Sequence, residues 1–268
     1  MNQKNYPLLL LVLLNLPAYL TSQSLDTTLT IHSEILSEER SIRIGLPYGY
    51  FESADDYSVL YIMDAEYRYD FCRAAQQYLG ISTRIPNSIM IGISNLSRET
   101  RNRDLLPSNF GGKDSLFRKF IELELIPFIE KNYRCKRERL LAGHSHGGIF
   151  AVNTLLQQPN LFDKYLATDP SFQIINSNLP DTWPADLSQK SLYICSSDGS
   201  YGYNEEIASD MYTNNVIFQN HRVQHAASGL RFHAEHIPDD HGNSFMTAFH
   251  RGLRWVNNWP ISKATLKQ

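Results

Sequence analysis

The sequence predicts one three-layer α/β domain, with a mostly parallel sheet that an antiparallel hairpin precedes. Three observations predict this fold. Short apolar runs alternate with helical patterns along most of the chain, as they do when helices connect parallel strands. Two strand-like runs separated by three polar residues come before that alternation. About 244 of the 268 residues remain after an apolar leader, which is enough chain for one large core.

The amino terminus is typical of a secretory signal peptide. Lys4 precedes an apolar stretch of about 14 residues that Asn15 and Pro17 interrupt, whereas a membrane-spanning helix needs about 20 apolar residues. We therefore expect residues 1–24 to be a signal peptide and residues 25–268 to be an exported domain, periplasmic or extracellular, without stable membrane insertion. An uncleaved amino-terminal anchor is the alternative.

The composition is that of an ordinary globular protein. Hydrophobic residues make up 42% of the chain and charged residues 20%, which excludes disordered, collagen-like and coiled-coil classes. The net charge of −3 offers no basic surface to a phosphate backbone, so we expect no nucleic-acid partner. Three cysteines permit one disulfide at most, and Cys195, inside an apolar run, is expected to be a buried thiol. Nothing in the sequence fixes the oligomeric state.

The expected strands fall into two groups. Residues 27–36 and 40–46 alternate or are β-branched on either side of a short polar turn, which predicts the antiparallel hairpin. The later runs are short and continuously apolar, as in strands buried on both faces. They are residues 59–63, 89–93, 140–142 and 192–195, with 165–168 and 231–237 as weaker candidates.

Helical patterns lie between and after these runs. Over residues 114–132, apolar residues recur every three or four positions and form one stripe, which predicts a helix packed on the sheet. Pro127 has no backbone N–H, so we expect a kink or break there. Glu124 lies at the edge of the stripe and needs solvent or a polar partner. Two further helices are expected over residues 147–156 and 244–259.

A Gly-His-Ser-His-Gly pentapeptide at residues 143–147 carries the clearest chemical signal. It stands between the apolar run ending at Ala142 and the helix that begins near Gly148. A G-x-S-x-G motif at a strand-to-helix junction is the nucleophile elbow, whose glycines permit a tight turn that exposes the serine hydroxyl. The motif therefore predicts that Ser145 is a nucleophile.

A serine nucleophile needs a base and an acid, which follow it in the order Ser, Asp or Glu, His on this kind of sheet. His241 comes after the last expected strand, and we take it as the base. Asp198 follows the strand that ends near Cys195, and we take it as the acid that orients the base. Glu205 and Glu206, on the same loop, are the alternatives for the acid.

Two backbone amides are needed to hold the oxyanion of a tetrahedral intermediate. We expect one from His146, directly after the nucleophile, and the other from Glu66, in the loop after the strand that ends at Met63. Backbone donors leave almost no side-chain signature in a sequence.

Candidate substrate-binding residues lie in the loops that follow two of the expected strands. Arg101 and Arg103 stand on the side where parallel sheets bind ligands, and an arginine there could hold an anionic or polyhydroxy group of the substrate. An internal pairing with Asp104 that braces the loop is the alternative. Tyr67 is a candidate wall of an aromatic cleft, as are Tyr69, Phe110 and Phe172, with a place in the core as the alternative for each.

A metal site is not expected. His233 and His236, beside His241, lack the spacing of a zinc motif, and in a strand the first two point to opposite faces.

Several further segments complete a family pattern. They are Asp64-Ala65-Glu66-Tyr67, Ile91-Gly92-Ile93-Ser94-Asn95, residues 101–107, residues 124–130, Asp169-Pro170-Ser171-Phe172 and Asp240-His241-Gly242-Asn243-Ser244. Together with the elbow, these segments resemble the putative-esterase family of α/β-hydrolases, which includes siderophore trilactone esterases, feruloyl esterases and S-formylglutathione hydrolases. The resemblance extends over residues 27–259.

The resemblance implies an α/β-hydrolase fold with an eight-stranded sheet and a serine esterase activity without metal or cofactor. It also implies that Ser145 and His241 are the catalytic pair. His146 and Ala65 depart from the family pattern, which more often has an apolar residue and a glycine at those positions. We therefore expect a hydrolase of small-molecule carboxylic esters; an acyltransferase with the same triad and a non-catalytic binding protein on this fold are the alternatives.

Overall fold

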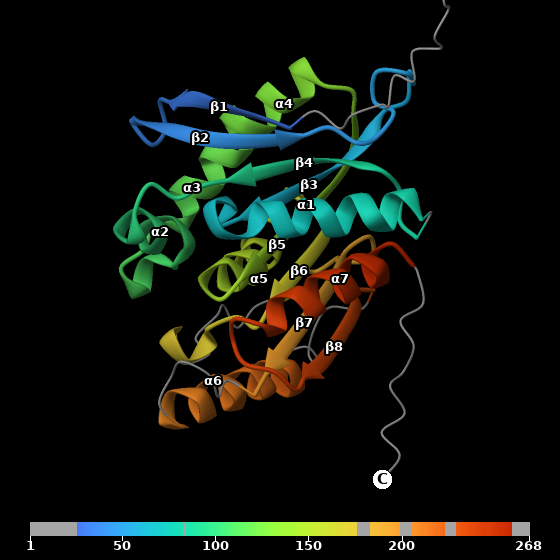
Figure 1. The fold of residues 1–268 in the computed structure, drawn as a ribbon. Helices are drawn as coiled ribbons and strands as arrows, with labels where there is room; N and C mark the ends of the chain where they lie inside the picture. The colour runs from blue at the N-terminus through green and yellow to red at the C-terminus, as the bar shows by residue number, and fades with distance from the viewer. Residues whose placement is uncertain (1–25, 83, 176–182, 199–204, 223–228, 259–268) are drawn as a thin grey trace, which may run out of the picture.

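The computed structural model describes residues 26–82, 84–175, 183–198, 205–222 and 229–258, which form an eight-stranded sheet with helices on both faces (Figure 1). The strands are β1 (Asp26–Ser33), β2 (Glu38–Gly45), β3 (Tyr57–Met63), β4 (Ser88–Ile93), β5 (Cys135–His144), β6 (Lys164–Thr168), β7 (Ser191–Ser197) and β8 (Arg231–Ile237). Their order across the sheet is β1-β2-β4-β3-β5-β6-β7-β8. The expected leader, residues 1–24, lies outside the described residues.

The pairing of the strands confirms the expected fold. β1 and β2 form the antiparallel hairpin, and β2 pairs antiparallel with β4. Every other neighbouring pair, from β4 through β3 to β8, is parallel. The expected strands all form, including the two weaker candidates that became β6 and β8.

The helices divide into two layers that match two buried cores. They are α1 (Ala65–Ile81), α2 (Arg98–Leu105), α3 (Asp114–Phe120), α4 (Ile126–Asn132), α5 (His146–Gln157), α6 (Glu205–Ile217) and α7 (Ser244–Val256), with short 3₁₀ or π segments η1 (Ser108–Phe110), η2 (Ile121–Leu125), η3 (Phe172–Ile175) and η4 (Phe218–Arg222). In Figure 1, α1 and α7 cover one face of the sheet, and α3, α4 and α5 lie on the other. Successive side chains of β3 enter alternate cores: Leu60 and Ile62 pack with α1 and α7, and Tyr61 packs on the opposite side.

The predicted break near Pro127 takes the form of a π-helical segment. The helix begins at Asp114, passes through η2 and continues as α4, in which Pro127 occupies the first turn. The amide of Ile126 bonds to the carbonyl of Ile121, five residues earlier, in the wider π pattern. Glu124 has the polar partners that its position requires, because it accepts hydrogen bonds from Ser33 Oγ at 2.5 Å and from the Ile35 amide at 3.0 Å. That carboxylate ties the hairpin to the helical layer.

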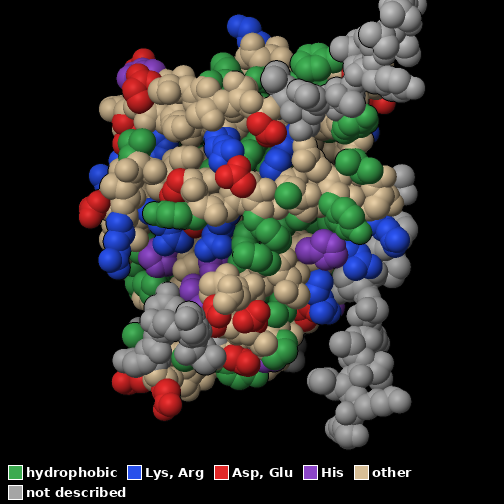
Figure 2. Space-filling view, viewed as in Figure 1, with side chains coloured by type: hydrophobic (Ala, Val, Ile, Leu, Met, Phe, Trp, Pro, Cys, Tyr) green, Lys and Arg blue, Asp and Glu red, His purple; other side chains and the backbone are tan. Residues whose placement is uncertain are grey.

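The carboxyl ends of the parallel strands meet at one edge of the sheet, where α1, α5 and α7 begin (Figure 1). Arginine, lysine and histidine side chains gather on the corresponding side of the viewed surface, at the left in Figure 2. In the described part of the chain, no helix combines the length and apolar character that crossing a membrane requires. All three cysteines are unpaired, and Cys195 is fully buried as expected.

Candidate active site

The Ser145 backbone has the geometry of a nucleophile elbow. β5 ends at His144 and α5 begins at His146, so the serine is the single residue between them. Its φ of 61° and ψ of −119° are a strained conformation for a residue with a side chain. A Cβ on Gly143 would lie 2.1 Å from the carbonyl oxygen of Gly147, so the turn can close only with glycine there. The sequence motif and the local geometry therefore agree.

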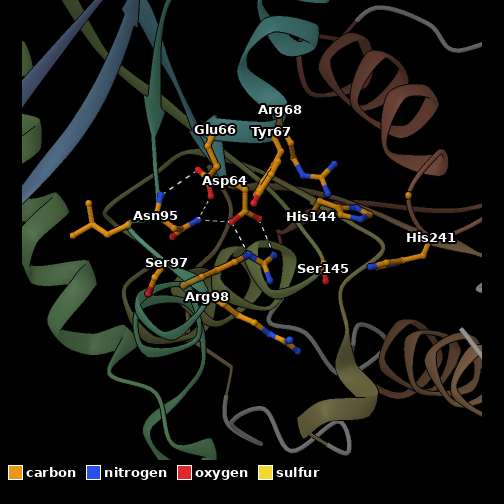
Figure 3. Close-up of a pocket in the computed structure, with 13 residues that line it drawn as sticks. Asp64, Glu66, Tyr67, Arg68, Asn95, Ser97, Arg98, His144, Ser145 and His241 are labelled. Carbon is orange, nitrogen blue, oxygen red and sulfur yellow. Dashed lines mark hydrogen bonds and ion pairs between the residues drawn. The ribbon is translucent and has the colours of Figure 1, made fainter. Parts of the chain in front are cut away.

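His241 lies on the loop between β8 and α7 and is held by Asp169. Its Nδ1 is 2.6 Å from Asp169 Oδ2, and the two residues are 6% and 1% exposed. An ionised carboxylate can only accept, so Nδ1 donates and Nε2 is left as the basic nitrogen. Figure 3 shows the His241 ring turned toward Ser145.

The acid beside His241 is not the residue expected from the sequence. Asp198, at the end of β7, lies 2.8 Å from His236 Nε2 and is 48% exposed. Glu205 and Glu206, the alternatives, are exposed in the first turn of α6. The acid beside His241 is Asp169, which directly follows β6, whereas Asp198 follows β7. The register between β5 and β6 sets the position of Asp169.

Strand register explains why Asp169 reaches the site. β5 and β6 are neighbours in the sheet, and His144 pairs with Thr168. The residues that directly follow these two strands, Ser145 after β5 and Asp169 after β6, therefore lie side by side at the carboxyl edge of the sheet. The Ser145 amide donates to the Thr168 carbonyl at 3.1 Å, which fixes the two strand ends together.

The ring of His144 packs against the ring of His241. Its ring centroid is 4.4 Å from that of His241, and the planes are inclined by 32°. The side chain is 1% exposed, and its Nδ1 is 3.3 Å from Thr168 Oγ1. Burial, with the positive charge of Arg68 nearby, lowers the pKa of His144 well below its ordinary value. A neutral ring therefore covers one side of His241.

The two amides expected to hold an oxyanion both lie in first turns of helices. His146 is the first residue of α5, and Glu66 is the second residue of α1. N–H groups in a first turn have no carbonyl one helical turn earlier, so they are free of intrahelical bonds. The Glu66 side chain holds the neighbouring loop, since its carboxylate accepts from the Asn95 amide at 3.1 Å and from Asn95 Nδ2 at 3.0 Å.

A cavity of about 460 Å³ opens beside Ser145 (Figure 3). Ser145 and His241 line one side of the cavity. The first residues of α1 and α2, with the loops that precede these helices, line the other side. Tyr67 lines it with a side chain that is 83% exposed, which places the ring at the rim. Tyr69 and Phe172 are buried instead, as in the core alternative, and Phe110 is packed against the core.

The two arginines expected to bind substrate are both paired with acids. Arg101 lines the cavity, but its Nε and one terminal nitrogen bind the Asp64 carboxylate at 2.7 and 2.8 Å. Arg103 pairs with Glu38 and with Asp104. These pairs match the alternative in which the arginines brace the loop.

Two other arginines, which the sequence analysis did not single out, face the cavity. Arg68 and Arg98 both line it, and neither has a carboxylate at ion-pair distance among the residues described. Arg68 lies 4.3 Å from the centroid of the Phe245 ring, and its Nε is buried without a hydrogen-bond partner. Burial lowers the pKa of this guanidinium from its ordinary value. The cavity thus presents positive charge that the described side chains leave unpaired.

The fold and the site define a class of protein. A mostly parallel sheet of this order, with a serine on an elbow and a buried His–Asp pair beside it, is an α/β-hydrolase. The chain belongs to the putative esterase family, whose model matches residues 33–215. Membership confirms the resemblance read from the motifs.

Individual relatives fit that membership. The ferri-bacillibactin esterase BesA of Bacillus subtilis is 31% identical over 139 residues, which are 43% of this chain and 48% of BesA. This match and the match to a second Bacillus subtilis protein each span about half the length of the relative. Among solved structures, an IroE-like serine hydrolase of Shewanella oneidensis is 28% identical with a TM-score of 0.74, covering 88% of this chain and 80% of that one. The siderophore hydrolase EstB of Aspergillus nidulans is 18% identical with a TM-score of 0.74. That match covers 89% of this chain and 97% of EstB, and it shows that the two proteins share a fold.

Proposed function

We propose that the protein is a serine esterase that hydrolyses carboxylic esters through an acyl-enzyme on Ser145. The observation that carries this proposal is the strained elbow, which places Ser145 beside a histidine held at 2.6 Å by a buried carboxylate. Family membership and relatives named as esterases support it. We assign the roles of nucleophile, base and acid to Ser145, His241 and Asp169, with Asp169 in place of Asp198.

Acylation begins with attack by Ser145 Oγ on the ester carbonyl carbon. His241 Nε2 takes the hydroxyl proton as the bond forms, and Asp169 stabilises the resulting imidazolium. The carbonyl electrons move to the oxygen, which the amides of His146 and Glu66 would hold. The intermediate then collapses, and His241 returns its proton to the departing alcohol.

Deacylation repeats the sequence with water. His241 takes a proton from the water as its oxygen attacks the acyl carbon, and the second tetrahedral intermediate releases the acid. The bond to Oγ breaks, its electron pair returns to Oγ, and His241 gives it the proton. The serine hydroxyl is restored without a metal or cofactor in the scheme.

Hydrolysis of p-nitrophenyl acetate and butyrate by the mature chain tests the nucleophile. We expect the release of p-nitrophenol to fall at least about a thousandfold in Ser145→Ala, because the acyl acceptor is gone. Ser196→Ala removes another buried serine and is the matched control, with a rate within about twofold of the unsubstituted protein. Activity unchanged in Ser145→Ala would overturn the mechanism.

We infer that the preferred esters carry an anionic group near the scissile bond. Arg68 and Arg98 face the cavity without acidic partners among the described residues, and a guanidinium binds carboxylate or similar oxygen anions well. The rim is open and bears the exposed Tyr67, which suits a bulky ester. Two fungal relatives are named as siderophore esterases, and these esters are the natural class to test. We also propose, from the leader, that the enzyme acts outside the cytoplasm.

The anionic preference is measured with a matched pair of substrates. We expect Arg98→Gln to lower kcat/KM for the monoester of succinic acid with p-nitrophenol by about tenfold, because a charge-assisted contact is lost. The rate on neutral p-nitrophenyl butyrate should change by less than about twofold. Arg137→Gln, an exposed arginine on β5, is the control and should affect neither substrate. An equal loss of kcat/KM on both substrates would show that Arg98 does not bind the anionic group of the substrate.

A further inference from the structure

A second serine lies against the nucleophile. Ser171 Oγ is 2.9 Å from Ser145 Oγ, and the Ser171 side chain is 3% exposed. The Ser171 amide also donates to the backbone carbonyl of Ser145 at 3.3 Å. The two residues are therefore joined through both backbone and side chain.

The segment that carries Ser171 is held rigidly. Asp169 begins the segment and accepts hydrogen bonds from His241, Ser197 and Asn215. Pro170 packs on the first turn of α5, where a Cβ on Gly148 would lie 3.0 Å from its Cα. Because Asp169 and Pro170 are held in this way, we expect Ser171 to stay beside the Oγ position when that oxygen carries an acyl group.

Counting protons assigns the direction of the hydrogen bond. Among the described residues, Ser145 Oγ is the hydrogen-bond partner of the Ser171 hydroxyl. If Ser145 donated to Ser171, the Ser171 proton would be buried without an acceptor, which costs free energy. If Ser171 donates, its proton is satisfied and the Ser145 proton is available to His241. The second arrangement satisfies both hydroxyls.

We propose that Ser171 is a catalytic residue that donates a hydrogen bond to Ser145 Oγ as this oxygen leaves during deacylation. The inference rests on the proposed acyl-enzyme mechanism. When the second tetrahedral intermediate collapses, the bond between the acyl carbon and Oγ breaks and its electron pair passes to Oγ. His241 gives that oxygen its proton, while Ser171 keeps its own proton and stabilises the developing negative charge.

The proposal makes the two halves of the reaction unequally sensitive to Ser171. In deacylation Oγ gains negative charge as it leaves, so a donated hydrogen bond lowers the barrier. In acylation the free Ser145 hydroxyl already accepts this hydrogen bond before it attacks, and Oγ gives its proton to His241 as it bonds to the carbonyl carbon, so the hydrogen bond gives no net advantage. Loss of the hydroxyl should therefore slow deacylation selectively.

Stopped-flow and quenched-flow kinetics of Ser171→Ala with p-nitrophenyl acetate test this. We expect the deacylation rate constant, followed as decay of the acyl-enzyme by intact mass, to fall about tenfold. The acyl-enzyme then accumulates, kcat and KM fall together, and kcat/KM, which reports acylation, stays within about twofold. Ser171→Cys, which nearly keeps the volume but donates weakly, should show the same pattern if the alanine variant folds poorly.

The outcomes separate this inference from the proposed function. An unchanged deacylation rate constant in both Ser171 variants, or a fall in kcat/KM with KM unchanged, would overturn the role of Ser171. The proposed function fails independently if Ser145→Ala keeps its activity or if no acyl group appears on the unsubstituted enzyme. Ser196→Ala, the buried-serine control, should match the unsubstituted protein in every rate constant.

Discussion

Four hydrogen bonds converge on the carboxylate of Asp169. Oδ1 accepts from the Ser197 amide at 2.9 Å and from Asn215 Nδ2 at 3.0 Å, while Oδ2 accepts from Ser197 Oγ and from His241 Nδ1. Each of these four partners donates to a carboxylate oxygen, and the residue is 1% exposed. The environment is built to hold one negative charge and to orient one imidazole ring.

Replacing the two candidate acids separately distinguishes them. Asp169→Asn should lower kcat for p-nitrophenyl acetate by roughly 10³- to 10⁴-fold, because an amide cannot hold His241 in the tautomer that leaves Nε2 basic. Asp198→Asn should change kcat by less than about twofold, since Asp198 contacts His236 at the surface. The measurement is kcat for the two variants, with melting temperature as the check on folding. A large loss in Asp198→Asn with a small one in Asp169→Asn would reverse the assignment.

The sequence could identify two members of the site but could not choose the third. The elbow motif marks Ser145, and the Asp-His-Gly run after the last strand marks His241. Asp169 and Asp198 both follow apolar strands and both satisfy the chain order Ser, Asp, His. Only the strand register, in which His144 pairs with Thr168, shows that Asp169 stands beside Ser145. A one-residue shift in either strand would move it to the other face.

At the scale of elements, the site is the contact between the start of α5 and the segment after β6. Gly148 lets Pro170 approach, since a Cβ there would lie 3.0 Å from both Pro170 Cα and Cβ. That approach sets the positions of Asp169 and Ser171. The backbone packing of two elements therefore positions two side chains of the site at once.

Gly148→Ala tests the packing of these elements. The added methyl group should push the Pro170 segment away by a few tenths of an ångström and lower kcat by about tenfold, because small misplacements of catalytic groups are costly. Gly252→Ala is the control: its Cβ would meet the Leu166 and Tyr193 side chains at 2.9 Å, in the core away from Ser145. It should lower the melting temperature but leave kcat within about twofold. Equal effects of both variants on kcat would contradict this account.

The elements that periodicity predicts are those with a clear apolar pattern. The strands buried on both faces were recognised, as were the helices that became α3 with α4, α5 and α7, whereas α1, α2 and α6 were not predicted. In α2 the reason is its sequence, Arg-Glu-Thr-Arg-Asn-Arg-Asp-Leu, which has no apolar residue before Leu105. Its amino end is instead set by a capping box between Ser97 and Thr100. Arg98, one of the cavity arginines, lies in this helix, so missing the helix also meant missing the residue.

At the scale of the whole molecule, buried histidines make stability depend on pH. Burial lowers the pKa of His144 well below its ordinary value. Burial, with Arg101 nearby, also lowers the pKa of His146 from 6.5 to about 4. Between these values the unfolded chain binds protons that the folded protein excludes. Stability is therefore greatest above about pH 6.5 and falls as the pH decreases toward 4.

Urea unfolding at several pH values measures this dependence. We expect the free energy of unfolding to decrease from pH 7 to pH 4, and His146→Gln to remove about 1 to 3 kcal/mol of that decrease. The free energy of unfolding should thus decrease less between pH 7 and pH 4 in the variant than in the unsubstituted protein. Identical pH slopes for the two proteins would mean that His146 titrates alike in the folded and unfolded chains.

Covalent capture of the nucleophile tests the central claim most directly. The unsubstituted protein is treated with a fluorophosphonate, and the modified residue is located by peptide mass spectrometry. We expect one phosphonyl group per chain, on Ser145, with complete loss of esterase activity, and no label in Ser145→Ala. Labelling of another residue with parallel loss of activity, or full activity in the labelled enzyme, would contradict it.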